Sequence, residues 1–439
     1  MRIHRTLFRT FMATLAISSS LRGQASEPAP EVWSFHGQAT TVTQGHGAFT
    51  SPYEGVNSFE SRKETRNSFT STLFLGRRLW EGAELYLNPE LAGGQGDSRV
   101  LGLAAAPNGE IYRVDSPELK VSLARLFLRQ AWNFAGASEP VAADQNQLAG
   151  SHSRRRIVMT AGKIALGDIF DINAYAHDPR TQFLNWSLMD TSAWDYPADT
   201  RGYSWGAAFE LYLDAWALRA GSFMMPTKAN GLSFDHQVNR AHGDVIEVEH
   251  DHEMGGQTGH IRILGYANHA GMGNYEESLQ RSPLSPDVVA TRQPGRIKYG
   301  WGLSADQVLT RDLGAFVRAG WNDGHTETWV FTEVDRSLAV GFSLAGTGWS
   351  RAQDRLGAAL VANGLSPDHR AYLAAGGLGF MLGDGRLNYD QERLFETYYA
   401  VPLGRFITAT LDAQRIWNPG YNRDRGPVDI YALRLHAQF

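Results

Sequence analysis

The chain has 439 residues, of which 43% are hydrophobic and 20% are charged, and its formal net charge is -5. This composition is too polar for a membrane protein built of helices, and the mild acidity without a long basic run excludes nucleic acid as the expected partner. Cysteine is absent, so an exported chain would take its stability from the fold itself rather than from disulfides.

The first 25 residues resemble a secretory signal peptide. Three arginines lie within the first nine residues, Phe11 to Ile17 form a short apolar core, and Gly23 and Ala25 are small residues at the expected cleavage positions. We therefore predict a signal peptide over residues 1–25 and one domain over residues 26–439. No other segment approaches the roughly 18 to 20 apolar residues of a membrane helix, which leaves a periplasmic, secreted or outer-membrane protein.

About sixteen segments of alternating apolar and polar residues follow along the chain. Alternation places one kind of side chain on each face of a strand. In the last segment Leu433 and Leu435 face one way, whereas Arg434 and His436 face the other. An apolar face toward lipid and a polar face toward a water-filled lumen are typical of outer-membrane barrels. The predicted strands are residues 32–43, 66–77, 80–92, 122–134, 157–164, 203–213, 216–223, 244–251, 259–269, 297–309, 314–321, 335–344, 355–363, 394–403, 406–416 and 428–439.

The connections between these segments alternate in length, since most of those after even-numbered segments are short and most of those after odd-numbered segments are long. This pattern predicts an all-β fold, namely a transmembrane antiparallel up-and-down β-barrel of about 16 strands, with short periplasmic turns and long extracellular loops. Residues 135–156 break the pattern, because they are long where a short turn is expected. We interpret them as a loose periplasmic excursion.

The third long connection, residues 165–202, is the best candidate for narrowing the pore. A closed sheet of about sixteen strands has a lumen too wide to fill with wall side chains. This connection is unusually rich in large apolar groups, which it would bury by folding back into the lumen. Its rings could stack on sugar C–H faces while its carboxylates, amides and guanidinium groups pair with hydroxyls. Alternatively, the same residues only pack the loop against the barrel wall.

Candidate sugar-binding residues come from this loop and from the inward faces of neighbouring strands. The loop contributes Asp171, Asn173, His177, Asp178, Arg180, Gln182, Asn185 and Trp194. The inward faces contribute Glu84, Tyr86, Arg125, Arg129 and Arg434. Opposed acidic and basic rows would orient solutes across the lumen, whereas the simpler alternative is a solvated wall without selectivity.

Several motifs in this loop and elsewhere in the chain occur together. They are Gly162-Lys163 through Asp168, Phe170-Asp171, Asn173, Tyr175, Asp178-Pro179, Gln182-Phe183 and Asn185, with LYLNPELAG at 85–93, WDYPADTRG at 194–202 and NPGYNRDRGP at 418–427. With these motifs the sequence resembles the OprB-type carbohydrate-selective porins of Gram-negative bacteria, and the resemblance covers the chain from about residue 31 to its end. The family implies a sixteen-stranded, monomeric barrel that passes monosaccharides by facilitated diffusion, with loops folded inward and charged residues, notably arginines, at the constriction. The motifs do not specify the preferred sugar.

Two other chemistries have weak support in the sequence. His250-Asp251-His252-Glu253 places two histidines on one face of a strand, but no third ligand is specified, so we expect a polar periplasmic rim and no metal. Ser151-His152-Ser153 brings serine near histidine, yet nothing fixes a nucleophile, a base and a group that orients the base. An outer-membrane hydrolase is therefore the enzyme-class rival, and we expect no enzyme and no cofactor.

The sequence therefore predicts a passive channel for small carbohydrates, integral to the bacterial outer membrane. The alternative is a general or anion-preferring porin of the same fold without a sugar site. The expected partners are small sugars in the pore, outer-membrane lipid around it, and the barrel-assembly machinery, which would recognise the carboxy-terminal strand ending in Phe439.

Overall fold

The structure is a computed structural model that describes residues 30–111 and 116–439. The predicted signal peptide therefore lies outside the described residues. Within the described ranges, every helix is too short or too polar to cross a membrane.

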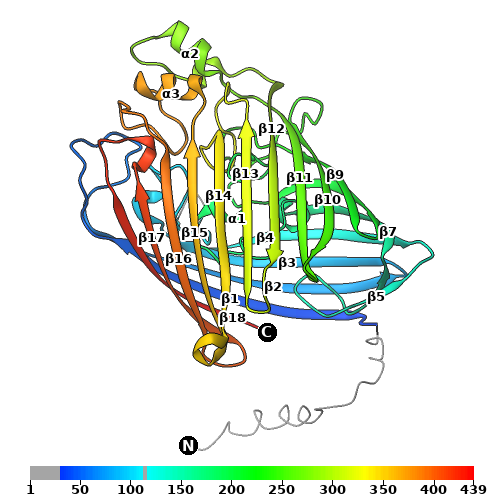
Figure 1. The fold of residues 1–439 in the computed structure, drawn as a ribbon. Helices are drawn as coiled ribbons and strands as arrows, with labels where there is room; N and C mark the ends of the chain where they lie inside the picture. The colour runs from blue at the N-terminus through cyan, green and yellow to red at the C-terminus, as the bar shows by residue number, and fades with distance from the viewer. Residues whose placement is uncertain (1–29, 112–115) are drawn as a thin grey trace, which may run out of the picture.

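Sixteen strands of the described chain close into one antiparallel barrel, in which the first strand pairs with the last (Figure 1). Gln38 lies opposite Gln438 and His46 lies opposite Ile430 in this closing pair. Because the sheet is closed, no backbone edge is left unpaired in lipid. The barrel strands are β1 (Trp33–His46), β2 (Glu64–Trp80), β3 (Ala83–Gly94), β4 (Ser116–Asn133), β7 (Arg155–Ile164), β8 (Ser204–Leu213), β9 (Trp216–Met224), β10 (His242–Met254), β11 (Gln257–Ala270), β12 (Arg296–Val308), β13 (Leu313–Asn322), β14 (Arg336–Gly346), β15 (Arg351–Gly364), β16 (Glu392–Pro402), β17 (Ile407–Trp417) and β18 (Val428–Gln438).

Each predicted strand corresponds to one barrel strand, but several observed strands extend beyond the predicted ends. For example, β10 continues to Met254 and β1 continues to His46. The backbone hydrogen bonds of a strand continue past the apolar belt. There both faces of the strand are polar, so apolar and polar residues no longer alternate. Periodicity therefore finds the membrane-facing part of a strand and underestimates its length.

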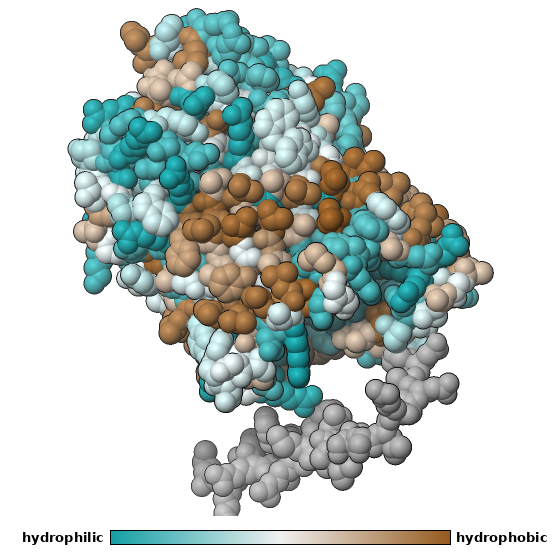
Figure 2. Space-filling model, viewed as in Figure 1, coloured by the Kyte–Doolittle hydropathy of each residue, from teal (hydrophilic) through white to brown (hydrophobic). Residues whose placement is uncertain are grey.

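Outward-facing side chains form the apolar belt that lipid requires. On β18, Tyr431, Leu433 and Leu435 are exposed, whereas Ala432 and Arg434 between them are buried inside the barrel. Figure 2 shows the hydrophobic residues as a brown band across the strands, with hydrophilic regions on both sides of it. This arrangement matches the predicted orientation of the last strand.

The two ends of the barrel differ in the length of their connections. The end at which β2 and β3, or β8 and β9, join by two residues is called the short-turn end, and the opposite end is called the long-loop end. The helices α2 and α3 lie at the long-loop end (Figure 1). The helical segments are α1 (Trp186–Met189), α2 (Tyr275–Arg281) and α3 (Pro367–Ala374), with 3₁₀ turns η1 (Asp97–Arg99), η2 (Leu166–Asp168), η3 (Val289–Thr291), η4 (Thr347–Trp349) and η5 (Pro419–Tyr421).

The connection between β4 and β7 is ordered, which corrects the interpretation of residues 135–156 as a loose excursion. It forms a hairpin of β5 (Ser138–Val141) and β6 (Gly150–Ser153). The tip of the hairpin turns into the barrel, where the backbone N–H of Leu148 donates a hydrogen bond to the Tyr86 hydroxyl (3.2 Å). This contact could not be predicted from the sequence, because a few buried groups within a polar segment carry no periodicity.

Candidate lumen site

The third long connection, residues 165–203, lies inside the barrel and is called the lumen loop. Inward-facing side chains of the wall bind its backbone. The Arg318 guanidinium on β13 donates hydrogen bonds to the carbonyls of Asp171 (2.7 Å), Ala176 and Leu188 (2.9 Å). Three carbonyls on different turns of the loop are thus held by one buried side chain.

Other strands hold the lumen loop in the same way. The Glu396 carboxylate on β16 accepts hydrogen bonds from the backbone N–H groups of Leu184 (2.5 Å) and Asn185 (3.2 Å). The Arg434 guanidinium on β18 donates to the carbonyls of Pro179 (2.5 Å) and Gln182 (2.7 Å). Glu247 on β10 accepts from the N–H of Asp171 (2.7 Å). We call Glu247, Arg318, Glu396 and Arg434 the clamp residues.

Apolar contacts hold the lumen loop against one side of the barrel. The Phe183 ring packs edge-on against Tyr398 of β16, with 4.9 Å between centroids. Phe170 packs against Phe223 of β9 and against Trp194 within the loop. The loop therefore fills the part of the lumen bounded by β8 to β18 and leaves space along β2, β3, β4 and β7.

A cavity of about 520 Å³ occupies that remaining space. Its wall side includes Thr70, Glu90, Arg125, Phe127 and Arg129, and its loop side includes His177, Asp178, Arg180, Asp190 and Tyr203. It reaches Val330 and Phe331 near the long-loop end and Gln145, Asn146, Gln147, His436 and Gln438 near the short-turn end. The volume is in the range of small-molecule sites in proteins, and the cavity follows the barrel between its two ends.

Charged pairs and aromatic rings alternate on the cavity surface. Arg125 binds Asp168 with two hydrogen bonds, from Nε (2.5 Å) and from Nη2 (2.7 Å). Arg180 binds Glu110 (3.0 Å) and lies 3.4 Å from Glu90. These pairs hold each guanidinium plane in a fixed orientation, because two-point contacts restrict rotation.

Tyr203 links the two arginine pairs of the cavity. Its hydroxyl donates to the Glu90 carboxylate at 3.2 to 3.3 Å, and the Arg125 guanidinium carbon lies 5.2 Å from its ring centroid. A ring, a carboxylate and guanidinium groups are therefore held together, as hydroxyl-bearing solutes require.

The acidic groups of the lumen loop differ in pKa. Burial opposes ionisation of Asp168, but the Arg125 guanidinium outweighs it and holds the pKa of that carboxyl below its usual range. The Asp178 pKa is also lowered, since Arg180 and hydrogen bonds from the loop outweigh burial. For Asp190, burial dominates and raises the pKa to about 6, although His177 lies nearby with 3.8 Å between Nδ1 and Oδ1.

The hairpin tip borders the cavity at the short-turn end. Arg129 Nη1 donates to the carbonyl of Asn146 (3.0 Å), and the Asn88 amide donates to the Asn146 side chain (2.9 Å). The Arg129 guanidinium carbon also lies 5.3 Å from the ring centroid of Tyr86. The position of the tip therefore depends on a side chain that also lines the cavity.

The structure places only some of the predicted binding residues on the cavity. Arg125, Arg129, His177, Asp178 and Arg180 line it. The other predicted residues support the loop or the wall instead and are absent from the cavity lining; they are Glu84, Tyr86, Asp171, Asn173, Gln182, Asn185, Trp194 and Arg434.

In the structure, these supporting residues contact protein groups. Trp194 has an exposed fraction of 0%, so its faces are covered by neighbouring side chains rather than open to solute. Arg434 holds the lumen loop backbone, as described above. Asp171 accepts hydrogen bonds from Thr191, and Asn173 donates to Ser304 of the wall (3.1 Å).

The remaining supporting residues bind their own neighbours in the same way. Asn185 accepts from the N–H of Ser187 (2.9 Å) at the start of α1, and Gln182 accepts from the N–H of His177 (2.7 Å). Glu84 accepts a hydrogen bond from the Tyr86 hydroxyl (2.7 Å). In the structure, these residues therefore pack the loop and the wall.

Several cavity residues lie outside the predicted set. Glu90 belongs to the inward face of a predicted strand, so alternation alone was sufficient to include it. Glu110 and Phe331 lie in long connections, and Asn146 lies in the hairpin tip. No periodic signal exists in such segments, and only the fold brings them to the cavity.

A family model described as the carbohydrate-selective porin, OprB family, matches residues 59–439. The structure resembles that of Pseudomonas putida OprB at high pH, with a TM-score of 0.71 and 16% identity over 93% of this chain and 94% of that chain. It also resembles, with TM-scores below 0.5, the low-pH structure of the same protein (0.47, 14% identity, 93% of both chains) and the channel DcaP of Acinetobacter baumannii (0.49, 9% identity, 93% of this chain and 97% of that chain). No curated protein matches the sequence.

Arg318→Met is expected to loosen the lumen loop. Three buried carbonyls of the loop would lose their donor, and each unsatisfied buried group costs about 1–3 kcal/mol. Single-channel conductance in planar bilayers should rise and become noisier, while the barrel remains folded by circular dichroism. The matched control is Arg336→Met, an exposed arginine at the start of the neighbouring strand β14. A conductance unchanged from wild type in Arg318→Met would contradict the clamp assignment.

Asp190→Asn is expected to reduce the pH dependence of ion selectivity. The Asp190 carboxyl, with a pKa of about 6, carries its charge above that pH and loses it below. Cation preference, measured as reversal potential in a salt gradient, should therefore fall in the wild type as pH drops from 7 to 5. The variant should show a smaller fall, because it lacks this titrating carboxyl. An identical fall in both proteins would exclude Asp190 as a source of the change.

Proposed function

Because the chain belongs to the OprB family of carbohydrate-selective porins, it is an outer-membrane channel for the diffusion of small carbohydrates, and we propose that sugars cross it through the cavity beside the lumen loop. The family and the fold indicate a channel rather than an enzyme. The closed antiparallel barrel with its apolar belt supports an integral position in the outer membrane.

One observation carries the assignment of the sugar path. The cavity brings the fixed pairs Arg125–Asp168 and Arg180–Glu110 together with the ring of Tyr203. A sugar presents hydroxyls around its edge and C–H groups on its faces, so it can exchange water for these groups at each step. Such contacts are weak enough to release the solute, which passage through a channel requires.

The direction of the path follows from the ends of the barrel. Outer-membrane barrels have long loops outside and short turns in the periplasm, so we place the long-loop end at the cell exterior. Sugars would enter near Phe331, pass between the lumen loop and β4, and leave beside Asn146 of the hairpin tip. Arg129, which binds the tip, would then control the width of the exit.

We also propose that one chain is a complete channel and that assembly proceeds through its last strand. All cavity residues come from a single barrel, which supports a functional monomer. The Phe439 backbone exchanges hydrogen bonds with Gly37 of β1 (3.1 Å), so the carboxy-terminus lies at the closing pair. Recognition of this terminus by the barrel-assembly machinery, with outer-membrane lipid around the belt, fits that position.

Sugar binding in the cavity can be measured as block of single-channel current by glucose, xylose and a disaccharide. We expect saturable block in the wild type and about tenfold weaker block in Arg180→Gln, which corresponds to about 1.4 kcal/mol. The control is Arg281→Gln on the exposed end of α2. Sugars should block the current of this variant as they block that of the wild type. Conductance indifferent to every sugar would instead favour a general or anion-preferring pore.

Arg129→Ala should raise conductance, because it removes a cavity side chain and also frees the Asn146 carbonyl at the exit. Arg129→Lys retains the charge but cannot reproduce the same planar donor geometry. If the exit is set by the hairpin tip, the conductance of Arg129→Lys should lie between those of wild type and Arg129→Ala. Equal conductance in all three proteins would remove Arg129 and the tip from the sugar path.

A further inference from the structure

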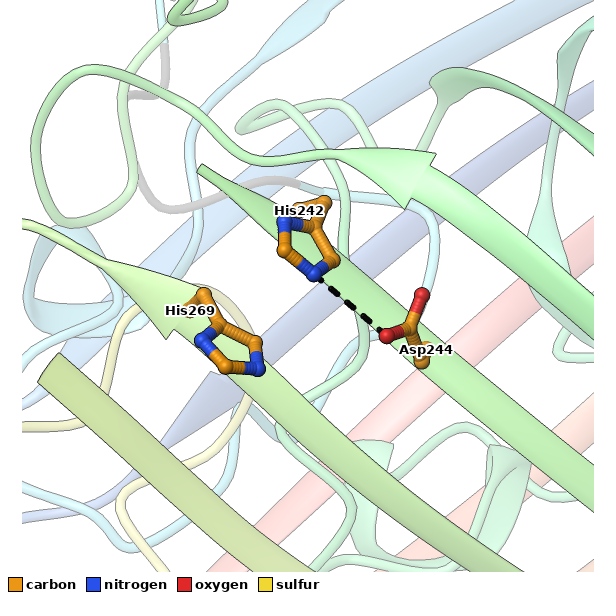
Figure 3. A group of neighbouring side chains, drawn as sticks. All are labelled: His242, Asp244 and His269. Carbon is orange, nitrogen blue, oxygen red and sulfur yellow. Dashed lines mark ion pairs between the residues drawn. The ribbon is translucent and has the colours of Figure 1, made fainter. Parts of the chain in front are cut away.

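Two histidines and an aspartate form a group at outward-facing positions of the barrel wall (Figure 3). None of the three lines the cavity. His242 and His269 lie directly opposite each other on the neighbouring strands β10 and β11. Asp244 is two residues after His242, so the alternation of the strand places it on the same face. One candidate ligand atom from each residue lies within 4.8 Å of the other two.

The side chains of this group lie close to one another. His242 Nε2 and Asp244 Oδ2 are 3.4 Å apart, as the dashed line in Figure 3 marks. The rings of His242 and His269 are 4.4 Å apart between centroids, with an interplanar angle of 15°. In addition, the buried Nδ1 of His242 has no hydrogen-bond partner among the described residues. The nitrogen of His242 that faces Asp244 is the other one, Nε2.

We propose that His242, Asp244 and His269 bind a divalent first-row transition metal ion of the Zn²⁺ class. Imidazole nitrogen suits Zn²⁺, Ni²⁺ and Cu²⁺, whereas Ca²⁺ and Mg²⁺ prefer sites made of oxygen ligands. Two imidazoles and one carboxylate match the composition of three-ligand zinc sites, which leave a position for water or an external ligand. The register of the two strands fixes the backbone of the three residues, and rotation of the stacked side chains would bring the three donors to one ion.

The position of the group gives such an ion a structural consequence. Residues 225–241 end at the start of β10, and residues 271–295 begin at the end of β11. An ion shared by His242 and His269 would link the two strands where these long loops join the barrel. Binding would therefore stabilise the folded barrel in proportion to the ion concentration relative to its dissociation constant.

The test uses the full-length mature protein without a histidine tag, purified in detergent and treated with a chelator. Zn²⁺ alone is titrated against a chromophoric chelator, and Co²⁺ replaces it for absorption spectra. We expect one ion per chain, a Co²⁺ spectrum with nitrogen ligands, and a higher midpoint of thermal unfolding with Zn²⁺. His242→Gln/His269→Gln should bind at least tenfold more weakly and lose the thermal shift, and Asp244→Asn should also weaken binding.

A matched control comes from the other end of the same strand. His250 and His252 share one face of β10 near the short-turn end, so His250→Gln/His252→Gln removes two histidines from the same element. This variant should bind Zn²⁺ like wild type. Undiminished Zn²⁺ binding in His242→Gln/His269→Gln would overturn the proposal, and so would loss of binding in the His250/His252 variant with retention in the other.

Discussion

The constriction of this channel depends on hydrogen bonds between wall side chains and the backbone of the lumen loop. A loop placed inside a barrel carries peptide groups away from bulk water, and each one needs a partner. The clamp residues Arg318, Glu396 and Arg434 supply these partners from β13, β16 and β18. The position of the cavity and of its charged pairs follows from the side of the lumen to which the loop is fixed.

Charged residues on the inner wall therefore have two different roles. Arg219, Glu247, Glu249 and Arg262 form a buried network on β9 to β11, in which Arg219 lies 2.8 Å from Glu247 and 3.1 Å from Glu249. Buried charges of this kind are costly unless every partner is present, so the network fixes the geometry of its wall. Arg125 on β4 instead meets its carboxylate on the cavity surface, as Arg180 of the lumen loop does, and water or a hydroxyl can reach both pairs.

This division explains what could be predicted from the sequence. Strands were predictable because lipid on one side and polar contents on the other impose strict alternation. The residues that line the cavity were not predictable in this way, because Arg129 and Arg434 both occupy inward positions on their strands. Only the side of the lumen that the loop covers decides that Arg434 holds the loop backbone and that Arg129 lines the cavity. The packing of Trp194 inside the loop likewise depends on contacts with Phe170, which lies 24 positions earlier by residue number.

The clamp formed by Arg434 also couples filtering to the completion of the sheet. Arg434 belongs to β18, which enters the barrel last in chain order and pairs with β1. During insertion, the preceding strands can form while Pro179 and Gln182 still lack this anchor. A partly inserted intermediate would hold the loop through Glu247, Arg318 and Glu396 but not at Pro179 and Gln182. The last contacts of the loop would thus form as the seam closes. Closure between β1 and β18 would then also complete the constriction of the pore.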